Sequence, residues 1–290
     1  MKRIAQAHGK NSKYNALVFP AKDMIWLLPG VAMYCLCYAV PYLISFLSSF
    51  LSNSDRPEFA GLENYRALFS DGFYWLSLKN TLLFLFAAIG TTLILGILIA
   101  HILFSLRYLQ PLIVLLLIPV FLPSSSLAAL WRAMMGSNSQ LVWLLHPRDA
   151  SWKYLSLFLL FLWKNLGVAT SLMLVGLHGI DPSILSAGEL DGASGRQLLC
   201  RIELPLLRHV IMFAIIYLLM NGVRIFRESY LLYGGYPPTN LFFVQHYING
   251  YFTRLDYSLL SSAAVVFSHV VLILFCIIWS ILRKGDCDEK

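Results

Sequence analysis

Charged residues are scarce in this chain of 290 residues, where Asp, Glu, Lys and Arg together make up 13%. Soluble domains carry about 25% charged residues, which they need to cover a surface that faces water. Apolar residues instead make up 58% of the chain, and they come in long unbroken runs. We therefore expect most of this chain to be surrounded by lipid rather than by water.

The sequence signatures of several chemistries are absent as well. The chain contains no Gly-rich GxxxxGK[ST] loop, so we do not expect it to bind ATP through that phosphate cradle. Its five cysteines include no CxxC pair, and its histidines are scattered singly, without paired acids or an activated nucleophile. We predict no catalytic residue, no metal site and no cofactor in this chain, and we expect no disulfide framework.

The positive net charge of +7 has a distribution that fits a membrane protein. The basic residues lie in the N-terminal tail, at the ends of apolar runs and in short loops, not in an aromatic-interleaved stripe, so we predict contact with a lipid bilayer and not with nucleic acid. Cytoplasmic segments of membrane proteins keep an excess of Lys and Arg. The excess here predicts that both termini are cytoplasmic.

Six apolar runs are candidates for membrane spans, since a helix needs roughly 20 residues to cross the hydrocarbon core. They are Ile25–Phe50, Thr81–Ser105, Leu109–Met134, Tyr154–Leu177, Val210–Leu232 and Ser258–Leu282. The sequence thus predicts an all-α membrane protein of about six transmembrane helices over residues 25–282, with cytoplasmic tails at 1–24 and 283–290. Pro119 and Pro123 interrupt the third run, so we expect a kinked helix there that packs inside the bundle.

The segment from about 181 to 209, between the fourth and fifth runs, carries seven acidic or basic residues among spaced leucines. Asp181-Pro182-Ser183 is typical of a helix start, Gly192 lies between two short helical patterns, and Pro205 precedes the next span. These features predict a helix, a turn and a second helix lying across the cytoplasmic face of the membrane.

This segment also contains two strings of defined spacing. The first reads Ser186-Ala187-Gly188-Glu189-Leu190-Asp191-Gly192-Ala193-Ser194, and the second reads Glu203-Leu204-Pro205-Leu206-Leu207. Together they resemble the EAA signature of ABC importer permeases, EAAxxDGAS followed by IxLPLL. Ser186 replaces the glutamate of that signature, and Gly188 replaces its second alanine.

The resemblance implies that the segment is a coupling helix, which docks into a groove on an ATPase subunit. The residues it assigns to coupling are Ser186, Ala187, Gly188, Glu189, Asp191, Gly192, Ala193, Ser194 and Pro205. Small residues let a foreign surface approach the backbone closely, while Asp191 and Glu189 could cap the second helix or pair with basic groups of the partner. The alternative is an ordinary amphipathic hairpin at the membrane interface.

Further strings extend the resemblance over nearly the whole chain. They are Phe59-Ala60-Gly61-Leu62-Glu63-Asn64-Tyr65 with Leu68-Phe69, Asn80-Thr81, Pro119 and Pro123 with Leu130-Trp131, Leu162-Trp163-Lys164-Asn165-Leu166-Gly167, and Tyr230-Leu231-Leu232-Tyr233-Gly234-Gly235-Tyr236-Pro237. The chain is similar to permeases of the carbohydrate-uptake class that includes the maltose and glycerol-phosphate importers. That class implies a type I ABC importer permease fold in a bacterial cytoplasmic membrane. It also implies a second homologous permease, two copies of an ATPase subunit that bind ATP and Mg, and an extracytoplasmic binding protein.

Polar side chains at membrane depth are costly and are therefore candidates for a substrate pathway. They are Lys164, Asn165, Asn221, Arg224, Arg227 and Glu228, with Trp131 and Tyr230 as neighbouring aromatic residues. Three cations against one acid would suit an anionic saccharide such as a uronate, which supplies the missing counter-charge. Alternatively, these groups form a structural network, because Arg224 and Glu228 have the i, i+4 spacing of a helical ion pair.

The predicted function is that of a non-catalytic permease subunit in an ATP-driven importer of a sugar or oligosaccharide. The alternative is an ion-coupled secondary transporter or a channel, which would also use several spans and polar groups at membrane depth. Such a protein would have no need of a docking hairpin, and inverted repeats with paired broken helices are not evident in the sequence.

Overall fold

The computed structural model describes residues 26–54, 58–106, 111–135 and 150–284, and it divides the chain into two units, Met1–Leu47 and Ser48–Lys290. Within these residues it is helical, with five helices long and apolar enough to cross a membrane, or six if one bent pair counts as a span. The predicted all-α membrane fold is therefore confirmed. The predicted tail 1–24 lies outside the described residues, as do residues 285–290.

The first unit contains the first predicted span. Helix α1 (Leu28–Tyr34), a π-helical turn (Cys35–Ala39) and helix α2 (Val40–Ser48) follow one another without interruption, and together they cover 21 residues. The π turn ends just before Pro41, which has no backbone N–H and whose ring would clash with a carbonyl of the preceding turn in a regular helix. Widening the turn at this point allows the helix to continue through the proline.

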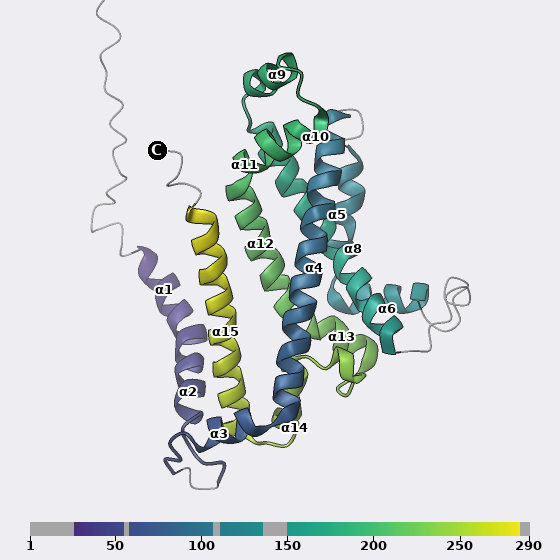
Figure 1. Ribbon diagram of the computed structural model, residues 1–290. Helices are drawn as coiled ribbons and strands as arrows, with labels where there is room; N and C mark the ends of the chain where they lie inside the picture. The colour runs from purple at the N-terminus through teal and green to yellow at the C-terminus, as the bar shows by residue number, and fades with distance from the viewer. Residues whose placement is uncertain (1–25, 55–57, 107–110, 136–149, 285–290) are drawn as a thin grey trace, which may run out of the picture. The chain divides into compact units, whose positions relative to one another are not determined.

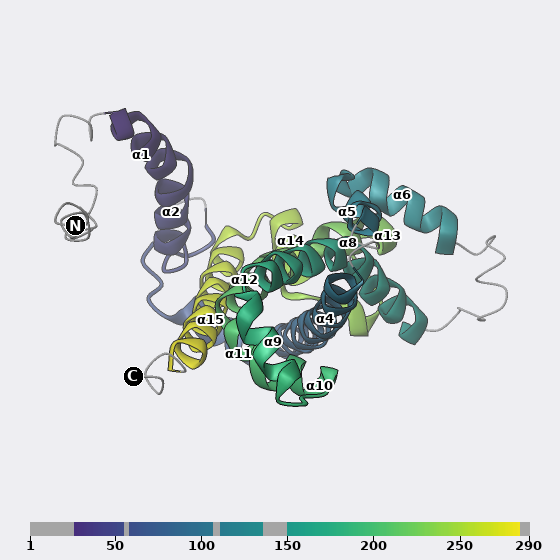
Figure 2. The ribbon, with the colours of Figure 1, turned by 90° about the horizontal axis from the view of Figure 1, so that it is seen from above.

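The second unit is built around three long helices that pack against one another (Figures 1 and 2), namely α4 (Gly72–Ser105), α8 (Ala150–His178) and α12 (Arg208–Val223). Their contact is filled by buried Phe84, Phe161 and Leu218. Gly222 lets α12 approach α4, because a Cβ there would lie 2.4 Å from a methyl carbon of Leu85. Close helix contact through a small residue is typical of membrane bundles.

The third predicted run is not one kinked helix. It consists of α5 (Ile113–Phe121) and α6 (Ser124–Met135), which meet at an angle of 112°. Pro123 disfavours helical backbone at Leu122, whose ψ of 133° is extended. The expected position inside the bundle is only partly correct: Gly167 of α8 lets α5 pack closely, but much of α5, including Leu115, is exposed in this chain.

Helix α4 begins nine residues before the predicted start of the second span, at Gly72 instead of Thr81. The added turns contain Lys79 and Asn80. These two polar residues mark the limit of an apolar run, but the helix continues through them. The side chain of Asp71 caps α4 by accepting a hydrogen bond from the backbone N–H of Phe73. The start of α4 is thus set by its cap.

The end of the second unit opposite α9 contains α3 (Glu63–Ser70), α14 (Val244–Thr253) and the start of α15 (Tyr257–Lys284), as Figure 1 shows. Here Asn64 of the FAGLENY string donates from Nδ2 to the backbone oxygens of Ser49 (2.9 Å) and Leu51 (2.8 Å). These bonds satisfy carbonyl groups just after α2.

The Asn80-Thr81 string acts in a similar way on the loop after α13 (Phe226–Tyr233). Asn80 Nδ2 donates to the backbone oxygen of Thr239 at 2.7 Å, while Thr81 Oγ1 accepts from the backbone N–H of Val244 at 3.0 Å. Both strings therefore hold connecting segments against the helices.

Candidate coupling segment and substrate pathway

The segment between α8 and α12 forms the predicted helix, turn and second helix at the end of the second unit opposite α3 and α14 (Figure 1). Its elements are α9 (Pro182–Leu190), α10 (Gly195–Leu198), a π-helical turn (Leu199–Glu203) and α11 (Leu204–Leu206). Asp181 caps α9 by accepting from the backbone N–H of Ser183 at 2.9 Å. This hydrogen bonding lowers the pKa of the Asp181 carboxyl below its usual value.

The turn between the two helices depends on two glycines. Gly192 has a φ of +80°, a left-handed conformation that costs other residues roughly 1–2 kcal/mol. Gly188 is buried, and a Cβ there would lie 2.8 Å from a methyl carbon of Ile202 and 2.9 Å from one of Leu198. Glycine at the third position of the motif therefore allows α9 to pack against the second helix.

The cap of the second helix differs from the prediction. Ser194, and neither Asp191 nor Glu189, is the N-cap of α10, and its backbone N–H donates to the side-chain oxygen of Gln197 at 2.7 Å. A hydroxyl followed three residues later by Gln is a capping box. Asp191 and Glu189 are both exposed, so their carboxylates remain accessible to another chain.

Sequence reasoning did not single out Leu190, which is 88% exposed between these two carboxylates. The exposed surface of the motif thus combines one large apolar side chain with Ser186, Ala187, Glu189 and Asp191. An exposed leucine flanked by acids and small residues is a suitable contact for a partner protein.

A polar contact with a buried glutamate joins this segment to α4. Glu203, 3% exposed, places its carboxylate 2.8 Å from Nδ1 of His101. Pro205 lies two residues after Glu203, and the π turn that ends at Glu203 widens the helix before this proline as the one before Pro41 does. In the sequence His101 is only one of several scattered histidines. The signal that could have located its partner is the membership of Glu203 in the second motif string.

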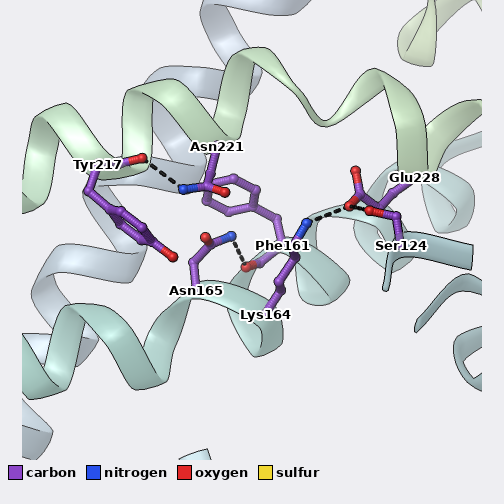
Figure 3. A network of polar contacts seen from close by, with 7 residues as sticks. All are labelled: Ser124, Phe161, Lys164, Asn165, Tyr217, Asn221 and Glu228. Carbon is purple, nitrogen blue, oxygen red and sulfur yellow. Dashed lines mark hydrogen bonds and ion pairs between the residues drawn. The ribbon is translucent and has the colours of Figure 1, made fainter. Parts of the chain in front are cut away.

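The polar residues at membrane depth form a second group (Figure 3). Lys164, in the middle of α8, places Nζ 2.5 Å from Oε1 of Glu228 on α13, and Ser124 at the start of α6 donates to the same oxygen at 2.9 Å. Glu228 is buried. The sequence offered an Arg224–Glu228 pair as the alternative to cargo binding. In the structure the carboxylate of Glu228 turns toward α8 instead, so the ion pair joins α13 to α8.

Two buried or half-buried amides lie between α8 and α12 in the same view (Figure 3). Asn165 donates to the backbone oxygen of Phe161 at 2.9 Å, and Asn221 donates to that of Tyr217 at 3.0 Å. Asn165 is fully buried, and its side-chain oxygen has no hydrogen-bond partner among the described residues. Such an oxygen is free to accept a bond from a ligand or from water.

Arg224 and Arg227 lie where α12 gives way to α13. The backbone there tightens, with Arg224 N–H bonded to the oxygen of Asn221 at 3.1 Å and Arg227 N–H to that of Arg224 at 3.1 Å. Both side chains are exposed, and neither forms an ion pair with the residues that the structure describes. The three predicted cations therefore differ: Lys164 is neutralised, whereas the two arginines are not.

The two aromatic candidates also differ from each other. Tyr230 is 44% exposed, while Trp131 is 5% exposed, stacks on Trp163 with ring centroids 5.7 Å apart and donates to the hydroxyl of Ser156 at 2.9 Å. Tyr230 is thus the more accessible of the two.

Comparison with known proteins identifies the relatives of this chain, although no family model matches it. It is 27% identical over 246 residues to the sulfoquinovosyl glycerol transport permease SmoG of Agrobacterium fabrum, an alignment that covers 79% of this chain and 78% of the relative. It is 28% identical to the trehalose/maltose permease MalF of Thermococcus litoralis (76% and 78% covered) and 27% identical to the sn-glycerol-3-phosphate permease UgpA of Pectobacterium atrosepticum (80% and 81% covered). The chain is a homologue of the permease subunits of sugar ABC transporters.

Solved structures agree with this assignment at the level of the fold. The permease superposes with a TM-score of 0.76, at 20% identity, on a chain from a bacterial ABC transporter involved in the import of the acidic polysaccharide alginate, covering 91% of this chain and 98% of the other. A structure of the alginate transporter with a pentasaccharide-bound periplasmic protein gives a TM-score of 0.77. The permease is thus a multi-pass membrane protein with the ABC importer permease fold, and these similarities give no support to a secondary transporter or channel.

Proposed function

We propose that the permease is the membrane-spanning subunit of an ATP-driven importer that translocates a saccharide delivered by an extracytoplasmic binding protein. It would lie in the cytoplasmic membrane with both termini inside, beside a second homologous permease and two ATPase subunits that bind ATP and Mg. The observation that carries this proposal is the exposed segment α9–α10, which joins two spans and presents the DGAS string at one end of the second unit. SmoG, MalF and UgpA, whose names describe transport permeases, support it.

Coupling would proceed through this segment. Exposed Leu190 can enter an apolar groove of the ATPase subunit, while Glu189 and Asp191 can pair with basic groups around it. The packing of Gly188 holds α9 against the second helix, and the His101–Glu203 contact joins that helix to α4, so a displacement of α9 would be passed to α4. Residues 186–189, 191–194 and Pro205 would thus act together as one docking and transmission element.

The cargo that we propose is an acidic saccharide. Glu228 forms an ion pair with Lys164 and accepts a hydrogen bond from Ser124. Arg224 and Arg227 therefore remain as exposed cations next to the break in the fifth span. A carboxylate can form a charge-assisted, bidentate contact with a guanidinium that a neutral hydroxyl cannot match. Asn221 would supply hydrogen bonds and Tyr230 the aromatic face that a sugar ring needs, while the predicted pathway residue Asn165 is fully buried. The acidic polysaccharide in the names of the structural neighbours supports this choice.

Stimulation of ATP hydrolysis tests the cargo proposal. The complex is reconstituted with its partner subunits, and its binding protein is loaded with an alginate tetrasaccharide or with the carboxyl-reduced, neutral counterpart. We expect Arg224→Gln and Arg227→Gln to reduce stimulation by the acidic ligand roughly tenfold and to leave stimulation by the neutral ligand nearly unchanged, because only the charged contact is lost.

The control is Arg66→Gln, which removes an arginine on α3, away from the break. Arg224→Lys separates charge from geometry, since lysine keeps the charge but not the planar fork of arginine. Unchanged stimulation by the acidic tetrasaccharide in both Arg→Gln variants would show that the arginines serve assembly with the second permease.

A further inference from the structure

A cavity of about 340 Å³ is lined by residues of α4, of α14 and of the loop after α13. Figure 1 shows α14 and the start of α4 at the end of the second unit that is opposite α9. The cavity lining includes Phe73, Tyr236, Tyr251, Asp71 and Arg254. Pockets that hold small ligands have volumes of roughly 300–1,000 Å³. The cavity is therefore large enough to hold a ligand.

The acid in the cavity wall is held in one orientation. Asp71 accepts from the backbone N–H of Phe73 with Oδ1 (2.8 Å) and from the hydroxyl of Tyr247 with Oδ2 (2.8 Å). Burial raises the pKa of the Tyr247 hydroxyl, so this group keeps its proton and remains a donor to Asp71. Each carboxylate oxygen keeps a lone pair with which to accept a further bond from a ligand.

Two aromatic residues of the cavity are highly accessible. Tyr236 is 77% exposed and Phe73 is 67% exposed, so each presents most of its ring surface. The guanidinium of Arg254 lies 5.8 Å from the ring centroid of Tyr251, a cation–π contact that orients it on the cavity wall. The aromatic rings can stack on a sugar ring, the carboxylate of Asp71 can accept from its hydroxyls, and the guanidinium of Arg254 can bind its carboxylate.

The inner wall of the cavity is shared with the break in the fifth span. His246 lines the cavity and is 1% exposed; its ring contacts that of Phe226 with centroids 4.7 Å apart. Phe226 is the first residue of α13 and lies between Arg224 and Arg227 in the chain. One layer of aromatic side chains therefore lies between the cavity and the segment that carries the two arginines.

We propose that this cavity is an external subsite that holds one sugar ring of an acidic oligosaccharide before it reaches the arginines of the fifth span. In this subsite Tyr236 and Phe73 stack on the ring, Asp71 accepts from its hydroxyls and Arg254 binds its carboxylate. The proposal rests on the proposed function, since it adds a second binding position for the same cargo.

The first test measures binding without the binding protein. Saturation-transfer difference NMR is recorded on the purified complex in phospholipid nanodiscs with the alginate tetrasaccharide and its carboxyl-reduced counterpart. We expect Tyr236→Ala to weaken binding of both probes roughly three- to tenfold, because ring stacking is lost. Arg254→Gln should weaken binding of the acidic probe alone. Phe252→Ala, which removes an exposed ring of α14 outside the cavity, should change neither.

The second test locates the ligand directly. Benzoylphenylalanine replaces Tyr236, or Phe252 as the control, and the adducts formed on illumination are identified by mass spectrometry. A tetrasaccharide adduct at position 236 and none at 252 supports the subsite. A binding-protein or phospholipid adduct at 236 in place of the saccharide, or unchanged NMR binding in Tyr236→Ala and Arg254→Gln, overturns it.

Stimulation of ATP hydrolysis by loaded binding protein is measured in parallel. Its absence in the unmodified complex contradicts the proposed function, whereas its presence with no adduct contradicts the subsite alone.

Discussion

At the scale of single residues, the ion pair of Lys164 and Glu228 shows how burial decides which charges remain available. Glu228 is buried and Lys164 nearly so, with side chains 2% and 18% exposed. An unpaired charge in such a place is costly, so the two groups neutralise each other across α8 and α13. Arg224 and Arg227, on the exposed side of the same segment, are under no such constraint. The residue types alone did not distinguish these cations.

Removing one member of this pair should cost more than removing both. We expect Glu228→Gln to destabilise the permease by about 3 kcal/mol, because it leaves Lys164 unpaired at membrane depth, whereas Lys164→Gln together with Glu228→Gln should lose much less. Thermal unfolding of the single and double variants in detergent measures this as a double-mutant cycle. Effects that simply add would show that the two side chains do not interact.

At the scale of elements, the coupling segment depends on turn geometry more than on charge. Gly192 adopts a left-handed backbone, and Gly188 packs where any side chain would overlap Ile202 and Leu198. The sequence located both glycines through the motif and through the turn that glycine favours. Of the two roles that the sequence left open for Asp191 and Glu189, capping of the second helix is not adopted, because Asp191 and Ser194 are both good N-cap residues and only the backbone path decides between them.

Replacing Gly192 by valine should uncouple transport. A β-branched residue at a φ of +80° is strained, so the turn must move and α9 loses its orientation. We expect saccharide uptake to fall at least tenfold, either with ATP hydrolysis retained or with loss of the ATPase subunit on co-purification. Asp191→Lys should weaken co-purification alone, since it alters only an exposed charge.

Gly195→Ala is the matched control in the same segment, because a Cβ there meets nothing within 4 Å and its φ is not positive. Normal uptake and normal co-purification in Gly192→Val and Asp191→Lys would contradict the docking role.

Two spans are broken, between α5 and α6 and between α12 and α13. Pro123 predicts an interruption of the third run, but not the angle of 112° between α5, which packs on α8, and α6, which packs on α13. The backbone also tightens at Arg224, between α12 and α13, but no proline in the sequence predicts this break. Both breaks lie beside the polar cluster, where Ser124 and Glu228 meet, so irregular backbone occurs where side chains can satisfy it.

At the scale of the whole molecule, the second unit has two chemically different ends. Helices α9 and α10 form one end, and α3, α14 and the start of α4 form the other (Figure 1). Residues of α4 and α14 at this second end line the aromatic cavity. If the coupling segment is cytoplasmic, the cavity must face outward. Alkaline phosphatase fused after Asp71 or after Tyr236 should then be active, and the fusion after Ser194 should be inactive. The reverse pattern of activity would invert the orientation and place the cavity inside the cell.

The sequence by itself determined that this protein lies in lipid, the approximate positions of its spans and the helix–turn–helix between the fourth and fifth spans, because these depend on composition, run length and local strings. Hydropathy and turn residues act over a few neighbours in the chain, so they can be recognised without a fold. Only the tertiary structure decided that Glu228 pairs with Lys164 instead of Arg224, that His101 meets Glu203, and that residues from α4, the loop after α13 and α14 enclose one cavity. Each of these contacts joins residues that are distant in the chain, and the close packing of helices at glycines such as Gly167 and Gly222 determines which of them come together.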